Sequence, residues 1–570
     1  MIRRALPLAA AFALVAPAAH AQSPADFFPR EPGATLVPET PVTAPDPEPE
    51  TGPVTPPGPA DPGPRLVLRG IALEGATAIP EADLAPIWAD LIGRPVSLDA
   101  LDSVAARIGA AYRARGFVLS QAVIPEQGVD DGIVRIQVIE GFIDRVAVTG
   151  GAPNQQGYAA TLFEPTVEER PLSLRTLERG VLLSRDTIGD GVETVVEPSP
   201  VTFGAADLTV LIEPDPIVGF AAINNRGSRL YGAWTAAGGA SVFNILGLNE
   251  RLDFLVAAAP KDGSLAYAEL RFDAPVPALT GTVLDGARFE LEADISRADP
   301  DFTQSGQPQD LEIVQNETNF GVGLFVPFTR TRSENLFGRL ALDWQDSESV
   351  TVFTGPDMAT QDRLLVLEAR ATWDIADSSG GVSLVDGLIR QGLPIGTTEI
   401  GDDGPSAGVA DFTLAALTLS RLQRLGDSPW ALYGQAIGQY AANILPNSER
   451  FSLGDATIGR GFAPGNTTGD SGFGGRVELR RGIAVTQAAQ VVEAVELYGF
   501  FDYGRAYDRS IERDGNQWET LASTGIGARI DLRDWLTITP EIARQTQGVA
   551  TDTTDPDHET RFYIGAVARF

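Results

Sequence analysis

The feature that most constrains this chain is a two-residue alternation of side chains that recurs through its second half. In the segment ARFELEADIS, residues 287–296, one set of alternate positions holds Ala, Phe, Leu, Ala and Ile, and the other holds Arg, Glu, Glu, Asp and Ser. The segment AYAELRFD, residues 266–273, alternates in the same way. Because successive side chains of a strand point to opposite faces, each segment predicts a strand with one apolar and one charged face. We interpret charge at nearly every position of one face as evidence against a soluble sandwich.

Lipid outside and water inside a closed barrel account for both faces, because closure also satisfies every backbone amide. Counting the alternating segments predicts a transmembrane β-barrel of about sixteen antiparallel strands over residues 216–570. The last ten residues, RFYIGAVARF, place Phe562 and Phe570 on one apolar face. This pattern is typical of a closing strand that signals assembly, so we expect outer-membrane lipid and the barrel assembly machinery as partners.

The first 64 residues predict export followed by a tether. Arg3 and Arg4 precede an apolar run and a small-x-small site at residues 19–21, which indicates a signal peptide over residues 1–21. Prolines recur among acidic and small residues up to Pro64, without hydrophobic periodicity. Residues 22–64 therefore predict a proline-rich disordered linker.

A repeat with a period of roughly 75 residues follows the linker. The strings IALEG, SLDAL and IQVIEG in the first copy correspond to VAVTG, SLRTL and LTVLIEP in the second. Ser97 and Ser173 are placed as helix N-caps, and Gly116 is placed to end a helix in the left-handed conformation. Each copy predicts a small α+β domain with a strand, a helix pair and two strands, over residues 65–142 and 143–215.

Composition excludes several classes of function. The chain has no cysteine and two histidines, His20 and His558, which argues against thiol catalysis, a Ser-His triad and a His- or Cys-based metal site. We therefore assign no catalytic, cofactor-binding or metal-binding residue and expect no enzyme. The acidic segment GDDG, residues 401–404, is interpreted as a solvated loop rather than a calcium site. A net charge of -33 argues against a nucleic-acid partner.

The run from Tyr112 to Gly141 resembles the first polypeptide-transport-associated (POTRA) domain of two-partner secretion transporters, the haemolysin secretion/activation class. The landmarks that carry the resemblance are Tyr112, Gly116, Phe117, Pro125, Gln127, Gly132, Glu140 and Gly141. The resemblance implies a transporter in the cell outer membrane whose two POTRA domains lie in the periplasm. Its implied partner is an unfolded, β-rich secreted exoprotein.

The same resemblance gives a role to the stretch TIGRGFAPGNTTGD, residues 457–470. In such transporters the connection between the eleventh and twelfth strands folds into the lumen and carries an Arg-Gly-aromatic tip. The matching residues here are Gly459, Arg460, Gly461 and Phe462, within an in-folded loop predicted over residues 443–470. The partner motif F-x-D-x-G is matched by Phe500, Asp502 and Gly504. An arginine inside a pore needs a carboxylate, and we expect Asp502 to supply it.

The preferred interpretation is a translocation pore that captures the exoprotein through its POTRA domains and secretes it to the cell surface. Two alternatives stay open at this point. One is an insertase of the same superfamily, whose loss would deplete many outer-membrane proteins. The other is a passive porin, which would not need residues 65–215.

Overall fold

The structure is a computed structural model of the 570-residue chain. The predicted signal peptide, the predicted linker, His558 and most of the acidic segment at 401–404 lie outside the residues that it describes. The described residues are 65–129, 131–213, 217–259, 264–300, 312–352, 358–400, 404–405, 408–483, 485, 491–509, 517–533, 535–551 and 559–570.

The first α/β unit, residues 65–141, packs one long helix on a three-stranded sheet with the order β2-β5-β4. Strand β2 pairs in parallel with β5, and β4 pairs antiparallel with it. Its elements are β1 (Leu66–Val67), β2 (Gly70–Glu74), α2 (Glu81–Leu84), the short 3-10 helices η2 (Ala85–Ile87) and η3 (Ala89–Leu91), β3 (Pro95–Val96), α3 (Leu98–Ala114), β4 (Gln121–Val123) and β5 (Ile133–Ile139).

Both ends of α3 follow from its sequence. The Ser97 hydroxyl accepts a hydrogen bond from the Ala100 amide at 3.3 Å, as expected of an N-cap. After the helix, Gly116 has a φ of +89°, and the Phe117 amide donates to the Tyr112 carbonyl at 3.0 Å. The helix expected before α3 is only the four-residue α2, because Pro86 has no amide with which to continue it.

The second α/β unit, residues 142–213, has the expected order of a strand, two helices and two strands. It consists of β6 (Phe142–Gly150), α4 (Pro153–Glu168), α5 (Leu174–Ile188), β7 (Val192–Pro198) and β8 (Ala205–Ile212). The sheet order is β6-β8-β7, so β7 lies at an edge. Helix α5 begins after Ser173, whose hydroxyl accepts from the Thr176 amide at 3.3 Å.

The second half of the chain forms a closed antiparallel barrel, in which the last strand pairs with the first. Sixteen long strands and the short hairpin segments β18 and β19 make up this sheet, which confirms the predicted count. The strands are β9 (Ile217–Asn224), β10 (Thr235–Phe243), β11 (Arg251–Ala258), β12 (Leu265–Pro275), β13 (Arg288–Ala298), β14 (Glu312–Arg330), β15 (Glu334–Val352), β16 (Met358–Ala376), β17 (Gly381–Gly392), β18 (Thr397–Ile400), β19 (Gly404–Pro405), β20 (Thr413–Arg424), β21 (Trp430–Ala441), β24 (Ser471–Ile483), β25 (Val492–Tyr507), β26 (Trp518–Leu532), β27 (Leu536–Gln547) and β28 (Thr560–Arg569). A further 3-10 helix, η4 (Pro277–Leu279), lies between β12 and β13.

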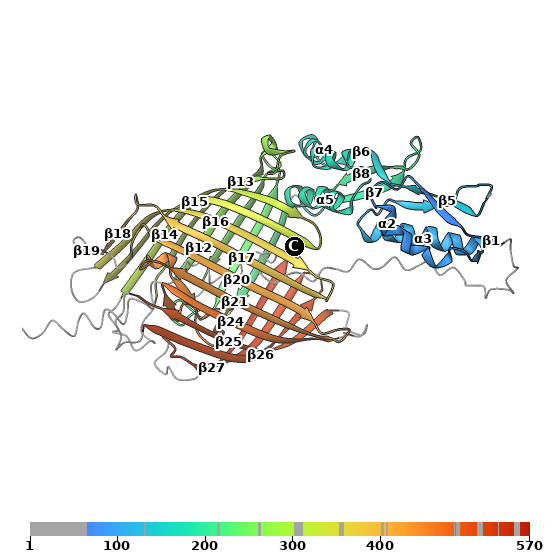
Figure 1. Ribbon diagram of the computed structural model, residues 1–570. Helices are drawn as coiled ribbons and strands as arrows, with labels where there is room; N and C mark the ends of the chain where they lie inside the picture. Colours follow the sequence, from blue (N-terminus) through green and yellow to red (C-terminus); the bar gives the residue numbers. More distant parts are fainter. Residues whose placement is uncertain are drawn as a thin grey trace, which may run out of the picture.

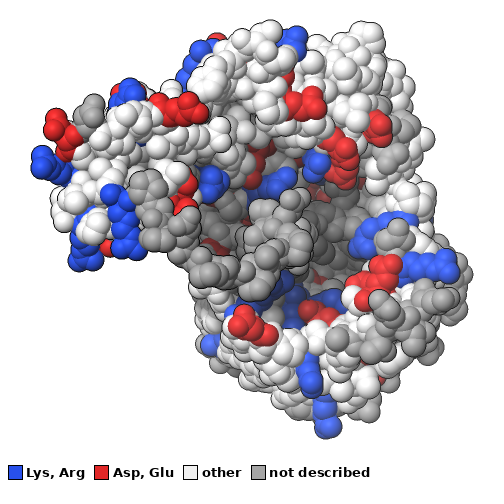
Figure 2. All heavy atoms as spheres, turned by 90° about the vertical axis from the view of Figure 1, so that its right-hand side faces the viewer, with Lys and Arg blue, Asp and Glu red and all other residues white. Residues whose placement is uncertain are grey.

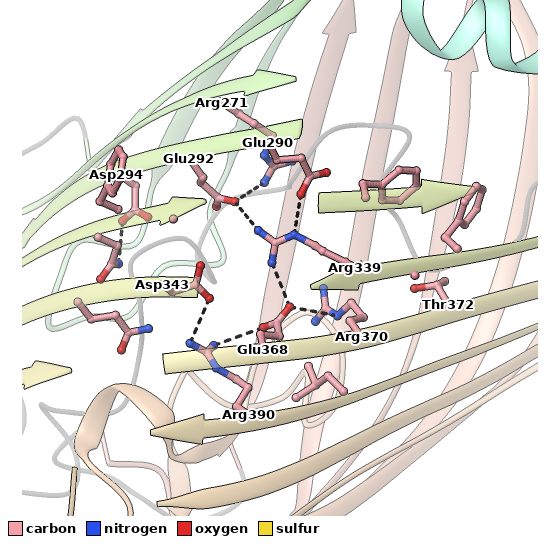
Figure 3. A pocket seen from close by; sticks show the side chains of 18 residues that line it. Arg271, Glu290, Glu292, Asp294, Arg339, Asp343, Glu368, Arg370, Thr372 and Arg390 are labelled. Atoms are coloured by element: carbon pink, nitrogen blue, oxygen red, sulfur yellow. Dashed lines mark hydrogen bonds and ion pairs between the residues drawn. The ribbon is translucent and has the colours of Figure 1, made fainter. Parts of the chain in front are cut away.

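The barrel has the two faces that the alternation predicts. On β13, Phe289 and Ile295 are exposed on the outside, whereas Glu290 and Glu292 point into the barrel (Figure 3). Seen from the end that carries the α/β units, the barrel mouth is a hollow with acidic and basic side chains on its wall, while its outer surface is mostly uncharged (Figure 2). Within the described part of the chain, no helix is long and apolar enough to span a membrane.

The two α/β units lie beyond one end of the barrel, and the second unit contacts its strand turns (Figure 1). Asp186 at the end of α5 forms two hydrogen bonds with the Arg330 guanidinium, at 2.7 and 2.9 Å. Arg179 of α5 donates to the carbonyls of Pro327 and Asp285 at 2.9 and 2.8 Å. We call this end the docked end of the barrel.

Candidate functional site

The connection between β21 and β24, residues 442–470, folds back into the barrel. These are the eleventh and twelfth long strands, as the sequence predicts. The loop contains η6 (Asn447–Glu449) and a two-stranded hairpin of β22 (Phe451–Leu453) and β23 (Thr467–Gly469). We call residues 442–470 the lumenal loop.

Local geometry presents Arg460 at the tip of the lumenal loop. The Asp455 carboxylate accepts hydrogen bonds from the amides of Thr457 and Ile458, at 2.5 and 2.8 Å. Gly459 has a φ of +89°, and a Cβ added there would lie 2.6 Å from Leu521. Only glycine fits this position, because both the left-handed backbone and the space require the absence of a side chain.

The Arg460 guanidinium binds Asp502 of β25 through two parallel hydrogen bonds. Nε lies 3.0 Å from Oδ2, and Nη2 lies 2.9 Å from Oδ1. The Arg460 amide also donates to Asp502 Oδ2, at 3.1 Å, and the Ser523 hydroxyl donates to the same oxygen at 3.2 Å. Arg460 is 3% exposed and Asp502 is fully buried. The planar guanidinium of an arginine can bind a carboxylate through two parallel hydrogen bonds in this way, whereas the ammonium group of a lysine cannot.

Two further carboxylates, which the sequence analysis missed, face the same guanidinium. Arg460 Nη1 lies 2.7 Å from Glu478 of β24 and 3.5 Å from Glu541 of β27. Each carboxylate has a second cation, because Glu478 also binds Arg480 at 2.8 Å and Glu541 binds Arg226 at 2.9 Å. Arg460 is therefore the central member of an ion-pair network and not half of an isolated pair.

The other residues of the two motifs lie around this network. The Phe500 ring lies under the guanidinium carbon of Arg460, 3.5 Å from it. Phe462 is 2% exposed and packs in a buried apolar cluster with Leu453 and Leu521. At Gly504 an added Cβ would lie 2.6 Å from Leu453, so glycine lets the loop approach β25 closely.

Gly461 lies against β26 and β27 on the same wall. Its carbonyl accepts a hydrogen bond from the Gln545 side chain at 2.9 Å. A Cβ added at Gly461 would lie 3.1 Å from both the Gln545 backbone nitrogen and the Ser523 Cβ. All seven residues that the sequence analysis singled out in the loop and on the wall therefore meet at one place on β24–β27. Glu478, Glu541, Ser523 and Gln545 complete it.

The beginning of the lumenal loop contacts a different part of the wall. Glu449 of η6 forms an ion pair with Arg390 of β17 at 3.1 Å. Arg390 lies beside a cavity of about 450 Å³, whose wall carries alternating acidic and basic side chains of β12–β17 (Figure 3). Within this cavity Arg339 binds Glu290 at 2.7 Å and Glu368 at 3.1 Å. The loop thus has one attachment on β17 and another on β24–β27.

Substituting Glu449 by Ala should loosen the first of these attachments. Arg390 would keep Glu368 and Asp343 at 3.9 Å, so its charge is not left alone. We expect a several-fold increase in the conductance of the barrel in planar bilayers, because the start of the loop would no longer be held against β17 inside the barrel. Asp427→Ala, which removes an exposed carboxylate from a strand turn, is the control. Equal conductance of Glu449→Ala and the unmodified protein would show that this attachment does not restrain the loop.

The first α/β unit has a polar site of its own around Glu140. Its carboxylate accepts hydrogen bonds from the Thr77 and Ala78 amides and from the Tyr112 hydroxyl, all at 2.7 Å. Burial raises the pKa of Glu140, but these hydrogen bonds outweigh it and hold the pKa below its ordinary value. The pKa of Tyr112 is raised by burial and by its bond to Glu140. Glu140 thus ties α3 to the segment that follows β2.

The remaining landmarks of this unit serve backbone geometry. The Gln127 side chain accepts a hydrogen bond from the N–H of Arg135 in β5 and donates one to the Arg135 carbonyl, at 2.8 Å each. It also donates to the Pro125 carbonyl at 3.3 Å. Phe117 packs beside Tyr112, with ring centroids 6.0 Å apart. At Gly132 and Gly141 an added Cβ would lie 2.4 Å from a backbone carbonyl oxygen, of Val67 and Leu119 respectively.

Replacing Glu140 by Gln should destabilise the first α/β unit. At neutral pH we expect the free energy of unfolding to fall by about 2 kcal/mol, because hydrogen bonds to a charged acceptor become neutral ones. The folded-state pKa lies below the ordinary value of 4.5, so the stabilisation is present above pH 4.5 and is lost as pH falls through the folded-state value. Urea unfolding at pH 7 and at pH 3 should show that the difference in the free energy of unfolding between the unmodified protein and Glu140→Gln is smaller at pH 3. Glu126→Gln, at an exposed position, should change neither measurement.

The closing strand β28 and the residue that follows it place the aromatic side chains of Phe562 and Phe570 on the outside. Phe562 is 58% exposed and Phe570 is 77% exposed. Phe570 also helps to close the barrel between β28 and β9. Its amide donates a hydrogen bond to the Gly219 carbonyl at 2.9 Å, and its carbonyl accepts one from the Gly219 amide at 2.7 Å.

Comparison with known proteins gives matches over both halves of the chain. Residues 66–141 match the model of the ShlB-type POTRA domain, and residues 208–530 match that of the haemolysin secretion/activation protein ShlB/FhaC/HecB. The heme/hemopexin transporter protein HuxB of Haemophilus influenzae is 22% identical, over 79% of this chain and 78% of its own. The hemolysin transporter protein ShlB of Serratia marcescens is 23% identical, over 82% and 79%. The solved structure of CdiB from Escherichia coli aligns with a TM-score of 0.64 at 18% identity, covering 91% of this chain and 93% of that one.

Proposed function

Because this chain belongs to the haemolysin secretion/activation family ShlB/FhaC/HecB, it is an outer-membrane transporter of two-partner secretion, and we propose that the lumenal loop is the gate of its pore. The docked end of the barrel is then the periplasmic end, since the POTRA domains of this family are periplasmic. The observation that carries the proposal is the burial of Arg460 among Asp502, Glu478 and Glu541 inside the barrel.

The two attachments of the lumenal loop support a gating role. A loop held at β17 and at β24–β27 runs from one part of the lumenal wall to another, and a polypeptide has to displace it in order to pass. A buried ion pair is weak evidence for stability, but removing one partner leaves a buried charge without compensation. Such an arrangement favours one loop position strongly and resists intermediate positions, which is what a gate requires.

The client is a secreted exoprotein that reaches the pore unfolded, and the second POTRA domain offers it a strand edge. Strand β7 pairs with β8 on one side, and no described strand pairs with its other side. Val195 and Val196 on β7 are 50% and 36% exposed. An extended β-rich client can add to this edge through main-chain hydrogen bonds, while the exposed valines contact its apolar side chains.

The transport step needs no covalent chemistry by this chain. The sequence contains no G-x-x-x-x-G-K-[ST] motif for nucleotide binding. Folding of the client outside the cell supplies direction, because a folded domain cannot return through the pore. Outer-membrane lipid and the barrel assembly machinery complete the set of partners: lipid contacts the apolar outer face, and the assembly machinery recognises the closing strand β28.

The test is a comparison of secreted and outer-membrane proteins with and without this chain. Loss of one large secreted product, with the outer-membrane protein profile unchanged, is the expected result. Broad loss of outer-membrane proteins would instead show an insertase. Deleting residues 65–213 distinguishes the porin alternative, because a porin keeps its permeability without them, whereas a secretion pore loses its product.

A further inference from the structure

The turn between β10 and β11, residues 244–250, presents three large apolar side chains at the periplasmic end of the barrel. Ile245 is 60% exposed, Leu246 is 62% exposed and Leu248 is 57% exposed. These values hold with the second POTRA domain in place. We call Ile245, Leu246 and Leu248 the apolar tip. A short polar turn would connect the two strands equally well, so the tip needs a reason other than connection.

The apolar tip stands on a base of buried polar groups. The fully buried Glu250 carboxylate accepts hydrogen bonds from the amides of Leu246 and Leu248, at 2.6 and 2.9 Å. Asn244 and Asn249 both adopt left-handed backbone conformations, with φ of +57° and +58°. Asparagine adopts this backbone conformation more readily than most residues, and the buried carboxylate is satisfied by the two amides, so these residues fix one conformation of the turn.

The second POTRA domain contacts this base directly. Asn154, in the first turn of α4, donates from its side-chain amide to Asn244 Oδ1 at 2.6 Å and to Asn249 Oδ1 at 2.9 Å. Asn249 donates back to the Asn154 carbonyl at 3.5 Å. The turn is therefore joined on one side to α4, while its apolar side chains stay uncovered.

The apolar tip continues the lipid-facing surface of the barrel. Val242 pairs with Leu252 of β11 and with Ile217 of β9, directly next to the turn. Further along the same outer face, Phe254 and Val256 are 46% and 60% exposed. Strands β9–β11 have eight or nine residues, which is at or just below the roughly 9–11 residues that a tilted strand needs to cross the hydrocarbon core, so the apolar turn would extend the lipid-facing band at this end.

We propose that the apolar tip inserts into the periplasmic leaflet of the outer membrane and, through Asn154, fixes the start of α4 near the bilayer surface. Lipid is the occupant because the tip is continuous with a surface that lipid already covers. Large apolar residues at such a boundary bind the interface in proportion to the area that they bury. A client segment is the competing occupant, and the experiment separates the two.

The chain has no cysteine, so one engineered cysteine gives one labelled site. A nitroxide is attached to Leu246→Cys, and the protein is reconstituted into phosphatidylethanolamine/phosphatidylglycerol vesicles. Phe254→Cys is the lipid-facing reference, and Ser378→Cys, in the exposed turn between β16 and β17, is the aqueous reference. Collision rates with oxygen and with a water-soluble nickel chelate are then measured by electron paramagnetic resonance.

We expect the label at 246 to resemble the Phe254 reference, with at least threefold less contact with nickel than the label at 378. Contact equal to that at 378 would overturn the proposal and leave the tip free for a client. Leu248→Cys repeats the measurement in case labelling at 246 disturbs the fold, which heat-modifiable migration on a gel reports for each variant. In the doubly labelled variant Ala160→Cys/Leu246→Cys, Asn154→Ala should broaden the distance distribution. An unchanged distribution would refute the role of Asn154.

Discussion

Arg460→Ala should abolish most secretion while the barrel remains folded. Removing the guanidinium leaves Asp502 and Glu478 buried, with Glu541 close by, and breaking a buried ion pair in this way costs about 3–5 kcal/mol. This free-energy cost destabilises the position in which the lumenal loop is attached to the wall. The loop therefore detaches and moves within the lumen. We expect a secreted product reduced tenfold or more, together with a larger and noisier conductance in planar bilayers, because a loop without its anchor occupies many intermediate positions instead of one defined position.

Two variants make this prediction specific. Arg460→Lys keeps the charge but loses the two parallel hydrogen bonds to Asp502, so it should fall between the unmodified protein and Arg460→Ala. Arg476→Ala removes another lumenal arginine, which reaches the loop only at the carbonyls of Ala456 and Thr457, at 3.4 and 3.3 Å, and should have a small effect. Detachment is also visible as new trypsin cleavage in the lumenal loop. Normal secretion by Arg460→Ala would rule out an anchoring role.

The sequence predicts the barrel well because its physics is local. Each strand has one face toward lipid and one face toward water. The structure of a segment such as residues 287–296 can therefore be predicted from that segment alone, without knowing which strands pair with it. The caps Ser97 and Ser173 and the terminator Gly116 are equally local, since each satisfies backbone groups within a few residues. The strand count followed from such signals alone, whereas the position of the lumenal loop needed the family resemblance as well.

The network around Arg460 depends on register between strands that are distant in sequence. Glu478 lies between Arg476 and Arg480 on the inward face of β24 and looks like any other lumenal residue in the sequence. Its place beside Arg460 follows from the pairing of Glu478 with Phe500 on β25, and Glu541 lies 63 positions further along the chain than Glu478. The motif F-x-D-x-G identified Asp502, but no alternation pattern distinguishes these two carboxylates from the rest of the wall.

The contact of Glu449 with Arg390 was missed for a related reason. The lumenal loop has no period, so the sequence does not indicate which of its side chains face the wall. Glu449 belongs to the short helix η6, whose position is fixed by Leu445 packing in a buried cluster with Leu364 and Phe412. Only the folded arrangement brings these residues from β16, the start of β20 and the loop together.

The network also predicts that exchanging the two charges fails. If Arg460 and Asp502 were an isolated pair, Arg460→Asp/Asp502→Arg would restore an attraction and part of the secretion. In the structure the carboxylate introduced at position 460 would instead face Glu478 and Glu541, where Arg460 Nη1 now lies 2.7 and 3.5 Å from them. Like charges at such distances repel strongly in a buried site. Secretion by the double variant should therefore be no higher than that of Arg460→Ala, measured as secreted product per folded barrel. Recovery above either single variant would show that Asp502 alone anchors the loop and that Glu478 serves Arg480 and Arg529 instead.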